Sequence, residues 1–338
     1  MKTYTDYPLL KHNTFRIDAR CRRYVEYDSA EELSRLLPSL HGEPFLHIGG
    51  GSNLLFTQDF PGTILHSAIR DVEVVRSEGD DVWVRAGAGL EWDEFVDFCT
   101  REGYYGLENL SLIPGEVGAS AVQNIGAYGV EAADCLAEVE TVDVETGQPH
   151  VLAAAECAYG YRTSIFKTTL RGKRIVTHVT YRLSRRFTPR LGYAALVREL
   201  AARGMAEDTL TAADVRRVVM EVRREKLPEP AETGSAGSFF VNPVVSRERF
   251  EALLADYPDM PHYPLPDGTV KIPAGWLIQQ AGWRGRSLGR AGVWPRQALV
   301  LVNLGGASGS DIVRLSDAIR ADVSGRFGID LQPEVNFI

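Results

Sequence analysis

The sequence predicts an α+β fold divided into more than one domain. Its 338 residues are enough for two or three domains that each bury a core. Short apolar segments with strand character alternate with segments whose apolar residues recur at helical spacing. A proline-punctuated stretch, residues 227–234, separates the last third of the chain from the rest. We therefore expect a domain boundary there, with a C-terminal domain at 227–338; an insert at about 185–226 precedes it.

The elements of the first hundred residues follow from local patterns. A Ser-x-x-Glu capping box at Ser29 predicts a helix that ends before Pro38. Residues 45–48 form a short apolar strand. Two runs of β-branched residues within 72–85 flank a Glu-Gly-Asp turn and predict a hairpin. Apolar residues at i, i+3, i+4 and i+7 then predict a helix over 92–103 that ends at a glycine.

The remaining elements are predicted from the same patterns, apolar residues at strand or at helical spacing. Strands are predicted at 139–144, 174–183 and 298–303, and helices at 211–222, 274–281 and 312–323. The insert at 185–226 is rich in arginine and alanine and contains the first of these helices.

Composition excludes several classes of function. A net charge of −8, with no run of basic residues, argues against a nucleic-acid partner. The N-terminus lacks the apolar core of a signal peptide, and no apolar run is long enough to cross a membrane. The four cysteines and seven histidines show no metal-ligand spacing, so we expect buried reduced thiols and no metal. These features predict a soluble cytoplasmic protein without a membrane partner.

Two glycine-rich stretches have no regular apolar pattern. Residues 113–130 carry four glycines, almost no charge and neither helical nor strand periodicity, so we expect an irregular segment. Its backbone, with Ser120, Gln123 and Asn124, offers hydrogen-bonding groups to a ligand. The second stretch, residues 49–53, is Gly-Gly-Gly-Ser-Asn directly after a strand, which makes a nest suited to a phosphate. Together they favour a flavin with a pyrophosphate; the alternative is a pair of glycine-rich packing loops.

Several motifs resemble those of the UDP-N-acetylenolpyruvoylglucosamine reductase family of flavoenzymes. The resemblance runs in order from about Asn13 to the last residue. It is carried by Gly50–Leu55, Ile113–Gly115 with Gln123–Gly129, Tyr161–Phe166, Gly234–Pro243 and Pro333–Ile338.

The family implies a fold, two cofactors and a reaction. The fold has two FAD-binding subdomains of the vanillyl-alcohol-oxidase/PCMH type, expected at 1–68 and 69–226, the second carrying the insert at about 185–226. A C-terminal α+β substrate-binding domain follows at 227–338, and its tail returns to the flavin. The reaction, in peptidoglycan precursor synthesis, is the NADPH-dependent reduction of an enolpyruvyl ether on a UDP-sugar through bound FAD. We also expect a monomer.

Such a reaction needs three kinds of group around the substrate. Hydride arriving at the enol ether leaves carbanion character that delocalises into the attached carboxylate, so the site needs a cation, a proton donor and a dry flavin face. The resemblance assigns Arg162 as the cation, Ser238 as the proton donor and Glu334 as a protonated partner acid. The alternatives are a surface ion pair, a turn-capping serine and a frayed terminus.

The other transferred roles are contacts. The expected FAD contacts are Gly49, Gly50, Gly51, Ser52, Asn53, Leu54, Ile113, Pro114, Gly115, Gly118, Ala119, Ser120, Gln123, Asn124, Gly126, Ala127 and Tyr128. The expected substrate contacts are Tyr161, Tyr193, Lys226, Gly237, Asn242, Arg284 and Gln297. Tyr193 belongs to the insert, which only one branch of the family has, and the residues around it depart from that branch's pattern.

Two other functions compete with this one. An FAD oxidase of the same fold often tethers its flavin through cysteine or histidine, and neither glycine stretch has a cysteine. A nucleotide-binding module without activity has no use for Arg162, Ser238 and Glu334 together. A yellow protein distinguishes the flavin enzymes from the module, and NADPH oxidation that depends on the enolpyruvyl substrate distinguishes the reductase from the oxidase.

Overall fold

The computed structural model describes all 338 residues, which form two compact units. Unit 1 comprises Met1–Tyr7, Cys21–Gly50 and Pro61–Arg223, and unit 2 comprises Pro8–Arg20, Gly51–Phe60 and Arg224–Ile338. All four cysteines are free and buried, as the sequence predicts. None of the helices combines the length and the apolar character that crossing a bilayer requires.

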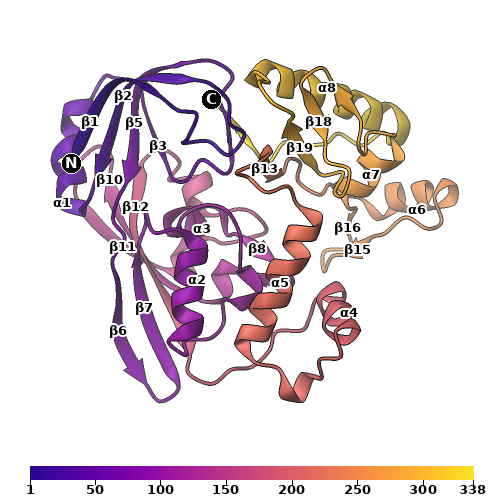
Figure 1. Cartoon of the computed structure of the whole chain (residues 1–338), viewed down its shortest axis with the longest axis horizontal. Coiled ribbons are helices and arrows are strands. Elements are labelled where there is room, and N and C mark those ends of the chain that lie inside the picture. Colours follow the sequence, from indigo (N-terminus) through magenta and orange to yellow (C-terminus); the bar gives the residue numbers. More distant parts are fainter. The chain divides into compact units, whose positions relative to one another are not determined.

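A five-stranded antiparallel sheet dominates unit 1 (Figure 1). Its order is β11 (Pro149–Ala153), β10 (Leu136–Asp143), β12 (Arg174–Ser184), β7 (Asp81–Gly87) and β6 (Val72–Glu78). The predicted hairpin is β6–β7, and the two strands predicted after the glycine-rich stretch are β10 and β12. These predictions are confirmed.

One face of this sheet packs against α2 (Trp92–Arg101) and α3 (Val117–Gln123). Trp92 and Phe95, whose helical spacing predicts α2, are fully buried with Tyr181 of β12. The apolar stripe of α2 is therefore core.

The absence of periodicity in residues 113–130 led to one wrong expectation, because α3 forms inside this stretch. Its residues are so small that they give no contrast between a buried and an exposed face. Gly118 lets the helix approach the sheet: a Cβ there would lie 2.8 Å from the Cβ of Ala88. The helix ends at Asn124, which adopts the left-handed conformation with φ +45°.

A second sheet of unit 1 has the order β1 (Lys2–Pro8), β2 (Arg20–Tyr27), β5 (Phe60–Ser67) and β3 (Phe45–Ile48). Strand β3 runs parallel to β5. Helix α1 (Ala30–Leu36) begins after Ser29, whose hydroxyl accepts the N–H of Glu32, as predicted. Val25 and Leu33 share a core with Val142 and Ile175 of the five-stranded sheet, so the two sheets of this unit pack together.

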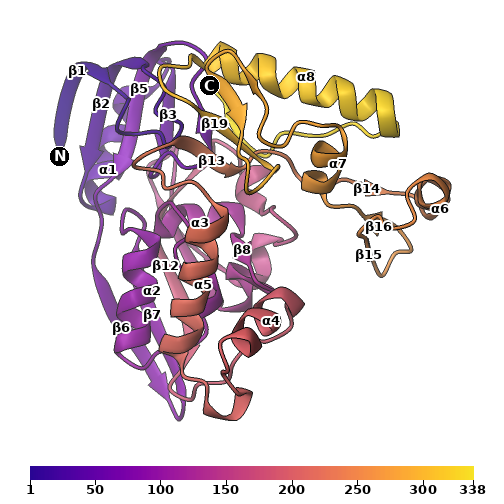
Figure 2. The same ribbon diagram turned by 45° about the vertical axis from the view of Figure 1, so that its right-hand side comes forward.

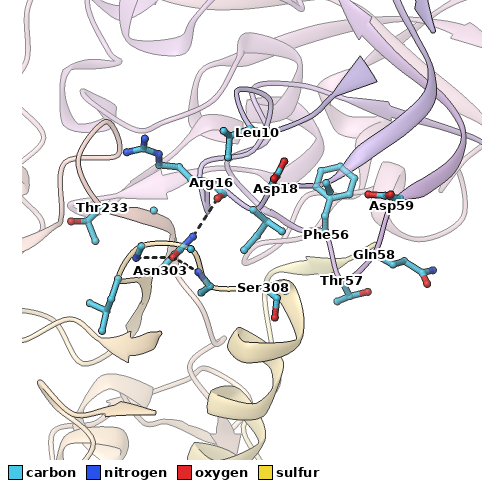
Figure 3. A pocket seen from close by; sticks show the side chains of 18 of the residues that line it. Leu10, Arg16, Asp18, Phe56, Thr57, Gln58, Asp59, Thr233, Asn303 and Ser308 are labelled. Carbon is cyan, nitrogen blue, oxygen red and sulfur yellow. Dashed lines mark hydrogen bonds between the residues drawn. The ribbon is translucent and has the colours of Figure 1, made fainter. Parts of the chain in front are cut away.

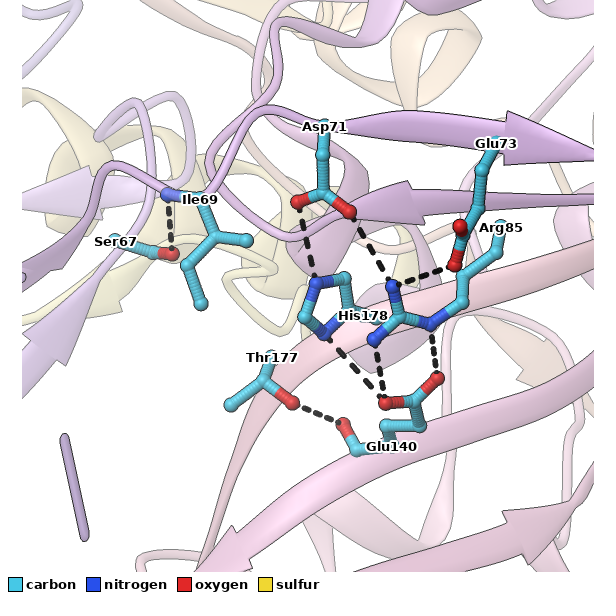
Figure 4. Close-up of polar contacts among 8 residues, drawn as sticks. All are labelled: Ser67, Ile69, Asp71, Glu73, Arg85, Glu140, Thr177 and His178. Carbon is cyan, nitrogen blue, oxygen red and sulfur yellow. Dashed lines mark hydrogen bonds and ion pairs between the residues drawn. The ribbon is translucent and has the colours of Figure 1, made fainter. Parts of the chain in front are cut away.

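A charged cluster joins four strands of the five-stranded sheet and the residue before β6 (Figure 4). Arg85 on β7 donates two hydrogen bonds to Glu140 on β10 and one each to Asp71 and Glu73. His178 on β12 lies between two of these carboxylates, with Nε2 3.3 Å from Asp71 and Nδ1 3.6 Å from Glu140. The carboxylates of the cluster thus accept the hydrogen bonds of the Arg85 guanidinium, which is half-buried.

The insert folds as two helices, α4 (Ala194–Ala202) and α5 (Ala212–Lys226). Leu196 and Leu200 pack against the valines of α5, whose spacing predicts that helix. Thr211 and Asp214 cap its start reciprocally. Helix α4 was not predicted.

In unit 2, a sheet of β13 (Gly234–Ser238), β19 (Val300–Asn303), β18 (Ala291–Val293) and β17 (Ser287–Leu288) packs against α8 (Gly309–Phe327), which in turn contacts α7 (Ala274–Gln280) (Figure 2). The predicted strand and both predicted helices are confirmed. Gly328, at φ +59°, caps the end of α8.

Small elements complete the chain. In unit 2, β14 (Val244–Val245), β16 (Val270–Lys271) and β15 (Tyr263–Pro264) form a small sheet, and α6 (Arg247–Asp256) lies between β14 and β15 in the chain. Strand β4 (Leu54–Leu55) pairs in parallel with β20 (Asn336–Phe337). In unit 1, β8 (Gly126–Ala127) pairs with β9 (Val130–Glu131). Short 3₁₀ helices occupy Leu37–Leu40, Glu108–Leu110, Ala132–Asp134, Ala154–Cys157, Ile165–Lys167 and Glu207–Thr209.

Unit 2 also contains a cavity of about 660 Å³ at the start of α8 (Figure 3). Arg16, Asp18, Asp59 and Trp294 contribute to its lining. The side chain of Asn303 forms one wall and is bonded to surrounding backbone, including the carbonyl of Phe15. None of the residues predicted to bind cofactor or substrate lines this cavity.

Candidate active site

The two glycine stretches meet inside unit 1. A Cβ placed on Gly50 would lie 3.4 Å from Cα of Gly115, and one on Gly49 would lie 3.2 Å from Oε2 of Glu116. The main chain of Gly50 thus packs against the main chain of Gly115, and Gly49 packs against the side chain of Glu116. Backbone N–H groups in turns without side chains suit a phosphate, so this glycine cradle, formed by Gly49–Gly51 and Gly115, fits the pyrophosphate of FAD.

The glycine turn continues into unit 2, where it joins the C-terminal tail. Gly51 has φ +67°, and a Cβ there would lie 2.0 Å from the carbonyl oxygen of His12. The Asn53 side chain donates to the carbonyl of Glu334 at 3.3 Å, and the carbonyl of Asn53 accepts the N–H of Asn336 at 3.1 Å. The tail is therefore tied to the turn, and Glu334 is not in a frayed end.

Ser238 and Glu334 lie on adjacent backbone segments of unit 2. The carbonyl of Phe239 accepts the N–H of Glu334 at 2.8 Å. Strand β13 has an extra residue between Ser235 and Ser238 relative to β19, and Gly237 within this bulge has φ +67°. A bulge re-aims the side chains that follow it. The Ser238 side chain is exposed, whereas Glu334 is half-buried.

Arg162 occupies a tight turn in unit 1. Gly160 and Thr163 exchange two backbone hydrogen bonds of 3.1 Å, and Arg162 between them has φ +55°. A glycine is the usual residue at such a position, and an arginine persists there only where its surroundings hold the backbone. The guanidinium donates to the carbonyls of Asn124 and Gly126 in the glycine-rich stretch.

Other predicted cofactor residues have their side chains engaged inside unit 1. The Ser120 hydroxyl donates to the carbonyl of Val117 and bonds with the hydroxyl of Tyr181 at 2.6 Å. The Asn124 amide donates to Glu131 and to the carbonyl of Gly160, which holds the Arg162 turn against the glycine-rich stretch. Any contact of Ser120 or Asn124 with a cofactor would therefore come through the main chain.

Two cations near Arg162 were missed by the sequence analysis. Lys167 donates through Nζ to the side-chain oxygen of Gln123 and to the carbonyl of Arg162. Arg223 donates through Nε to the carbonyl of Leu112 at 3.0 Å. Lys167 directly follows the Tyr161–Phe166 motif, which was the available signal. No signal in the sequence distinguished Arg223 from the other arginines of the insert.

The glycine-rich stretch and its partners concentrate backbone strain. Seven non-glycine residues have positive φ, and five of them lie here: Leu112, Asn124, Tyr128, Ala158 and Arg162. Such conformations persist where the surroundings impose them, and they cluster at functional sites.

Tyr193 of the insert lies against the glycine-rich stretch. Its ring packs edge-on against Tyr128 at 5.7 Å, and a Cβ on Gly129 would be 3.4 Å from the Tyr193 backbone nitrogen. The buried side chain of Asn109 donates to the carbonyls of Tyr128 and Arg190, which fastens the insert's first loop to this stretch. Burial raises the pKa of Tyr128.

The other predicted substrate residues of unit 2 are Lys226, Asn242, Arg284 and Gln297. Asn242 accepts the N–H of Ala274 at the start of α7. Arg284 donates to the carbonyl of Pro295 at 2.7 Å and to the side chain of Gln279. Gln297 accepts the N–H of Leu299 at 3.3 Å, and Lys226 is exposed at the end of α5. Tyr161, in unit 1, is exposed beside the guanidinium of Arg162.

Comparisons with known proteins agree with this arrangement. A family model described as FAD binding domain matches residues 22–153, and one described as UDP-N-acetylenolpyruvoylglucosamine reductase, C-terminal domain, matches residues 229–338. The crystal structure of UDP-N-acetylenolpyruvylglucosamine reductase from Thermus caldophilus aligns with a TM-score of 0.69 at 23% identity, covering 99% of this chain and 98% of that one. These matches confirm the predicted FAD-binding fold with its added C-terminal domain.

Fold and glycine cradle thus define an FAD-dependent oxidoreductase. UDP-N-acetylenolpyruvoylglucosamine reductase from Bacteroides fragilis is 56% identical over 98% of this chain and 99% of its own length. The enzyme of that name from Burkholderia pseudomallei is 50% identical over 97% of this chain and 95% of its own. The chain belongs to the UDP-N-acetylenolpyruvoylglucosamine reductase family.

Proposed function

We propose that this chain reduces the enolpyruvyl ether of UDP-N-acetylglucosamine enolpyruvate to the lactyl ether of UDP-N-acetylmuramate, with Arg162, Ser238 and Glu334 as the reacting groups. The observation that carries the reaction is identity of 50% and 56% to reductases of this name over nearly the whole chain. Bound FAD, once reduced by NADPH, supplies the hydride.

Arg162 is proposed to bind the substrate carboxylate. A guanidinium holds a carboxylate bidentately and holds the enolate more strongly as charge accumulates on it. Support comes from the strained turn at Gly160–Thr163, which fixes the backbone of Arg162, and from the carbonyls of Asn124 and Gly126, which orient its guanidinium. The neighbouring Lys167 and Arg223 add positive charge on the same side of unit 1.

Ser238 is proposed to give the proton, assisted by Glu334. A serine hydroxyl is a weak acid, so it needs a partner that stabilises the developing charge. The bulge at Gly237 and the hydrogen bond from the N–H of Glu334 to the carbonyl of Phe239 support this assignment, because they keep the two residues on neighbouring segments of unit 2.

Ser238→Ala tests the assignment in two half-reactions. Flavin reduction by NADPH should keep its wild-type rate. It is measured as the loss of absorbance near the flavin maximum. Reoxidation of the reduced enzyme by substrate should slow by about 10²–10⁴-fold, the usual contribution of a positioned proton donor.

Ser235→Ala is the matched control, because Ser235 lies on the same strand but is buried. It should leave both half-reactions intact. Equal loss of the two half-reactions in Ser238→Ala would show that Ser238 supports the fold or the cofactor instead of giving the proton. Preserved reoxidation would remove Ser238 from the chemistry.

We also propose that the enzyme is a cytoplasmic monomer that acts on a UDP-sugar. Four buried free thiols suit a reducing compartment. Sedimentation of the purified chain at a mass of about twice 37.3 kDa would contradict the monomer.

A further inference from the structure

Leu112, just before the glycine-rich stretch, has an unusual backbone conformation. Its φ is +57°, in the left-handed region. A branched side chain is disfavoured there and persists only where neighbouring groups hold the backbone. The sequence offers no glycine at this position, so something else must fix the turn.

Two helices hold the backbone of Leu112. Asp93 of α2 accepts its N–H through Oδ1, and Arg223 of α5 donates to its carbonyl at 3.0 Å. Both polar groups of the strained residue are therefore bonded to charged side chains, which form stronger hydrogen bonds than neutral ones.

Asp93 is itself fixed by Arg216 of α5. Nη1 of Arg216 lies 2.7 Å from Oδ1 of Asp93 and Nη2 lies 3.0 Å from Oδ2, a bidentate pair. Arg216 is only 8% exposed, and its other acidic contact is Asp97 at 3.4 Å. Burial would raise the pKa of Asp93, but hydrogen bonds from Arg216 and Leu112 outweigh it and lower that pKa, so the group is a carboxylate at neutral pH.

The residues after Leu112 lead directly to the cradle. The carbonyl of Gly115 accepts the N–H of Trp92, the neighbour of Asp93, at 2.9 Å, and Gly115 is the residue against which Gly50 packs. The direction in which the chain leaves Leu112 thus sets where Gly115 stands. No ligand need touch Asp93 for this effect.

We propose that Asp93, held by Arg216, is a positioning residue for FAD: it clamps Leu112 in the left-handed conformation and so aligns residues 113–115 with Gly50. The inference rests on the binding of FAD at the glycine cradle. Helix α5 of the insert takes part in this effect, because Arg216, which fixes Asp93, lies on it.

The test measures FAD binding to apoprotein by quenching of flavin fluorescence. Asp93→Asn keeps the shape of the side chain but loses the charge, and should raise the FAD Kd about tenfold, the equivalent of about one charge-assisted hydrogen bond. Asp97→Asn, which removes a carboxylate from Arg216 without touching Leu112, should change Kd less than about twofold. Adding Leu112→Gly to Asp93→Asn should bring Kd back to within about threefold of wild type, because glycine adopts positive φ unaided.

Recovery of FAD affinity in the double variant distinguishes a positioning role of Asp93 from a contribution to overall stability. If Asp93 only braced α2 against α5, Asp93→Asn would lower the unfolding midpoint and Leu112→Gly would not restore FAD affinity, which would overturn the proposal. Unchanged Kd in a folded Asp93→Asn protein would also overturn it.

If that variant does not fold, amide hydrogen exchange of the wild-type apoprotein decides. The N–H of Leu112 should be protected like the interior of α2, and exchange as fast as in an exposed loop would refute the clamp. Failure of the wild type to bind FAD would instead refute the cofactor site.

Discussion

Gly51→Ala is the sharpest test of the glycine turn. The substitution has two costs. At φ +67° an L-residue is disfavoured by about 1–2 kcal/mol. The added methyl would also stand 2.0 Å from the carbonyl oxygen of His12, and relieving an overlap of this kind costs about 1–3 kcal/mol more. We therefore expect a loss of about 2–5 kcal/mol in the free energy of unfolding.

Gly42→Ala isolates the first cost. Gly42 has φ +81°, but a Cβ there meets nothing within 4 Å. It should lose about 1–2 kcal/mol only. Urea unfolding of both variants measures the difference, and an FAD titration of the folded fraction should show at least about tenfold weaker binding for Gly51→Ala, because the turn must move to relieve the contact. Equal destabilisation of the two variants, with FAD affinity unchanged, would refute the close approach of the turn to residues 12–13.

Two other predictions concern carboxylates. Glu334→Gln should preserve flavin reduction by NADPH and slow reoxidation by substrate by about 10²-fold or more, measured by stopped-flow absorbance; full activity would remove Glu334 from the site. Glu140→Gln should lower the free energy of unfolding by about 1 kcal/mol at pH 7, because the hydrogen bonds from Arg85 lower the pKa of Glu140. A lowered pKa stabilises the fold above the unfolded-state pKa and loses that effect as pH falls through the folded value, so the difference between the variant and the wild type should begin to narrow below about pH 4.3 and shrink further on acidification in urea titrations. A difference in unfolding free energy that is as large at about pH 3 as at pH 7 would contradict the ion-pair origin of the effect.

Periodicity predicted the elements whose two faces differ. Helix α2 has Trp92 and Phe95 on one side and charges on the other, and strands β6 and β7 flank an obvious turn. Helix α3 was missed because glycine and alanine make all its faces alike, so that only the tertiary contact of Gly118 with Ala88 decides its structure. Helix α4 was missed within the arginine-rich insert.

Part of the candidate site is marked in the sequence by an unusual run of residues. The glycine run after a strand stands out by itself, whereas Arg162 was assigned from the resemblance of the Tyr161–Phe166 motif, because its left-handed backbone cannot be seen in the sequence. The inward orientation of Ser120 and Asn124 could not be predicted, because their hydroxyl and amide groups suit a buried protein partner as well as a cofactor. Lys167 and Arg223 were likewise ordinary cations until the fold brought them to the glycine-rich stretch.

The pairing of β4 with β20 has a consequence for biosynthesis. Asn53 and Glu334, which it holds together, are 281 residues apart. At about 5–20 residues per second, a ribosome takes roughly 14–56 s to synthesise the chain between them. During that interval Leu54 and Leu55 have been synthesised, but their partner strand β20 has not. The pairing that ties the Glu334 segment to the glycine turn therefore forms only after the chain as far as Phe337 has been made.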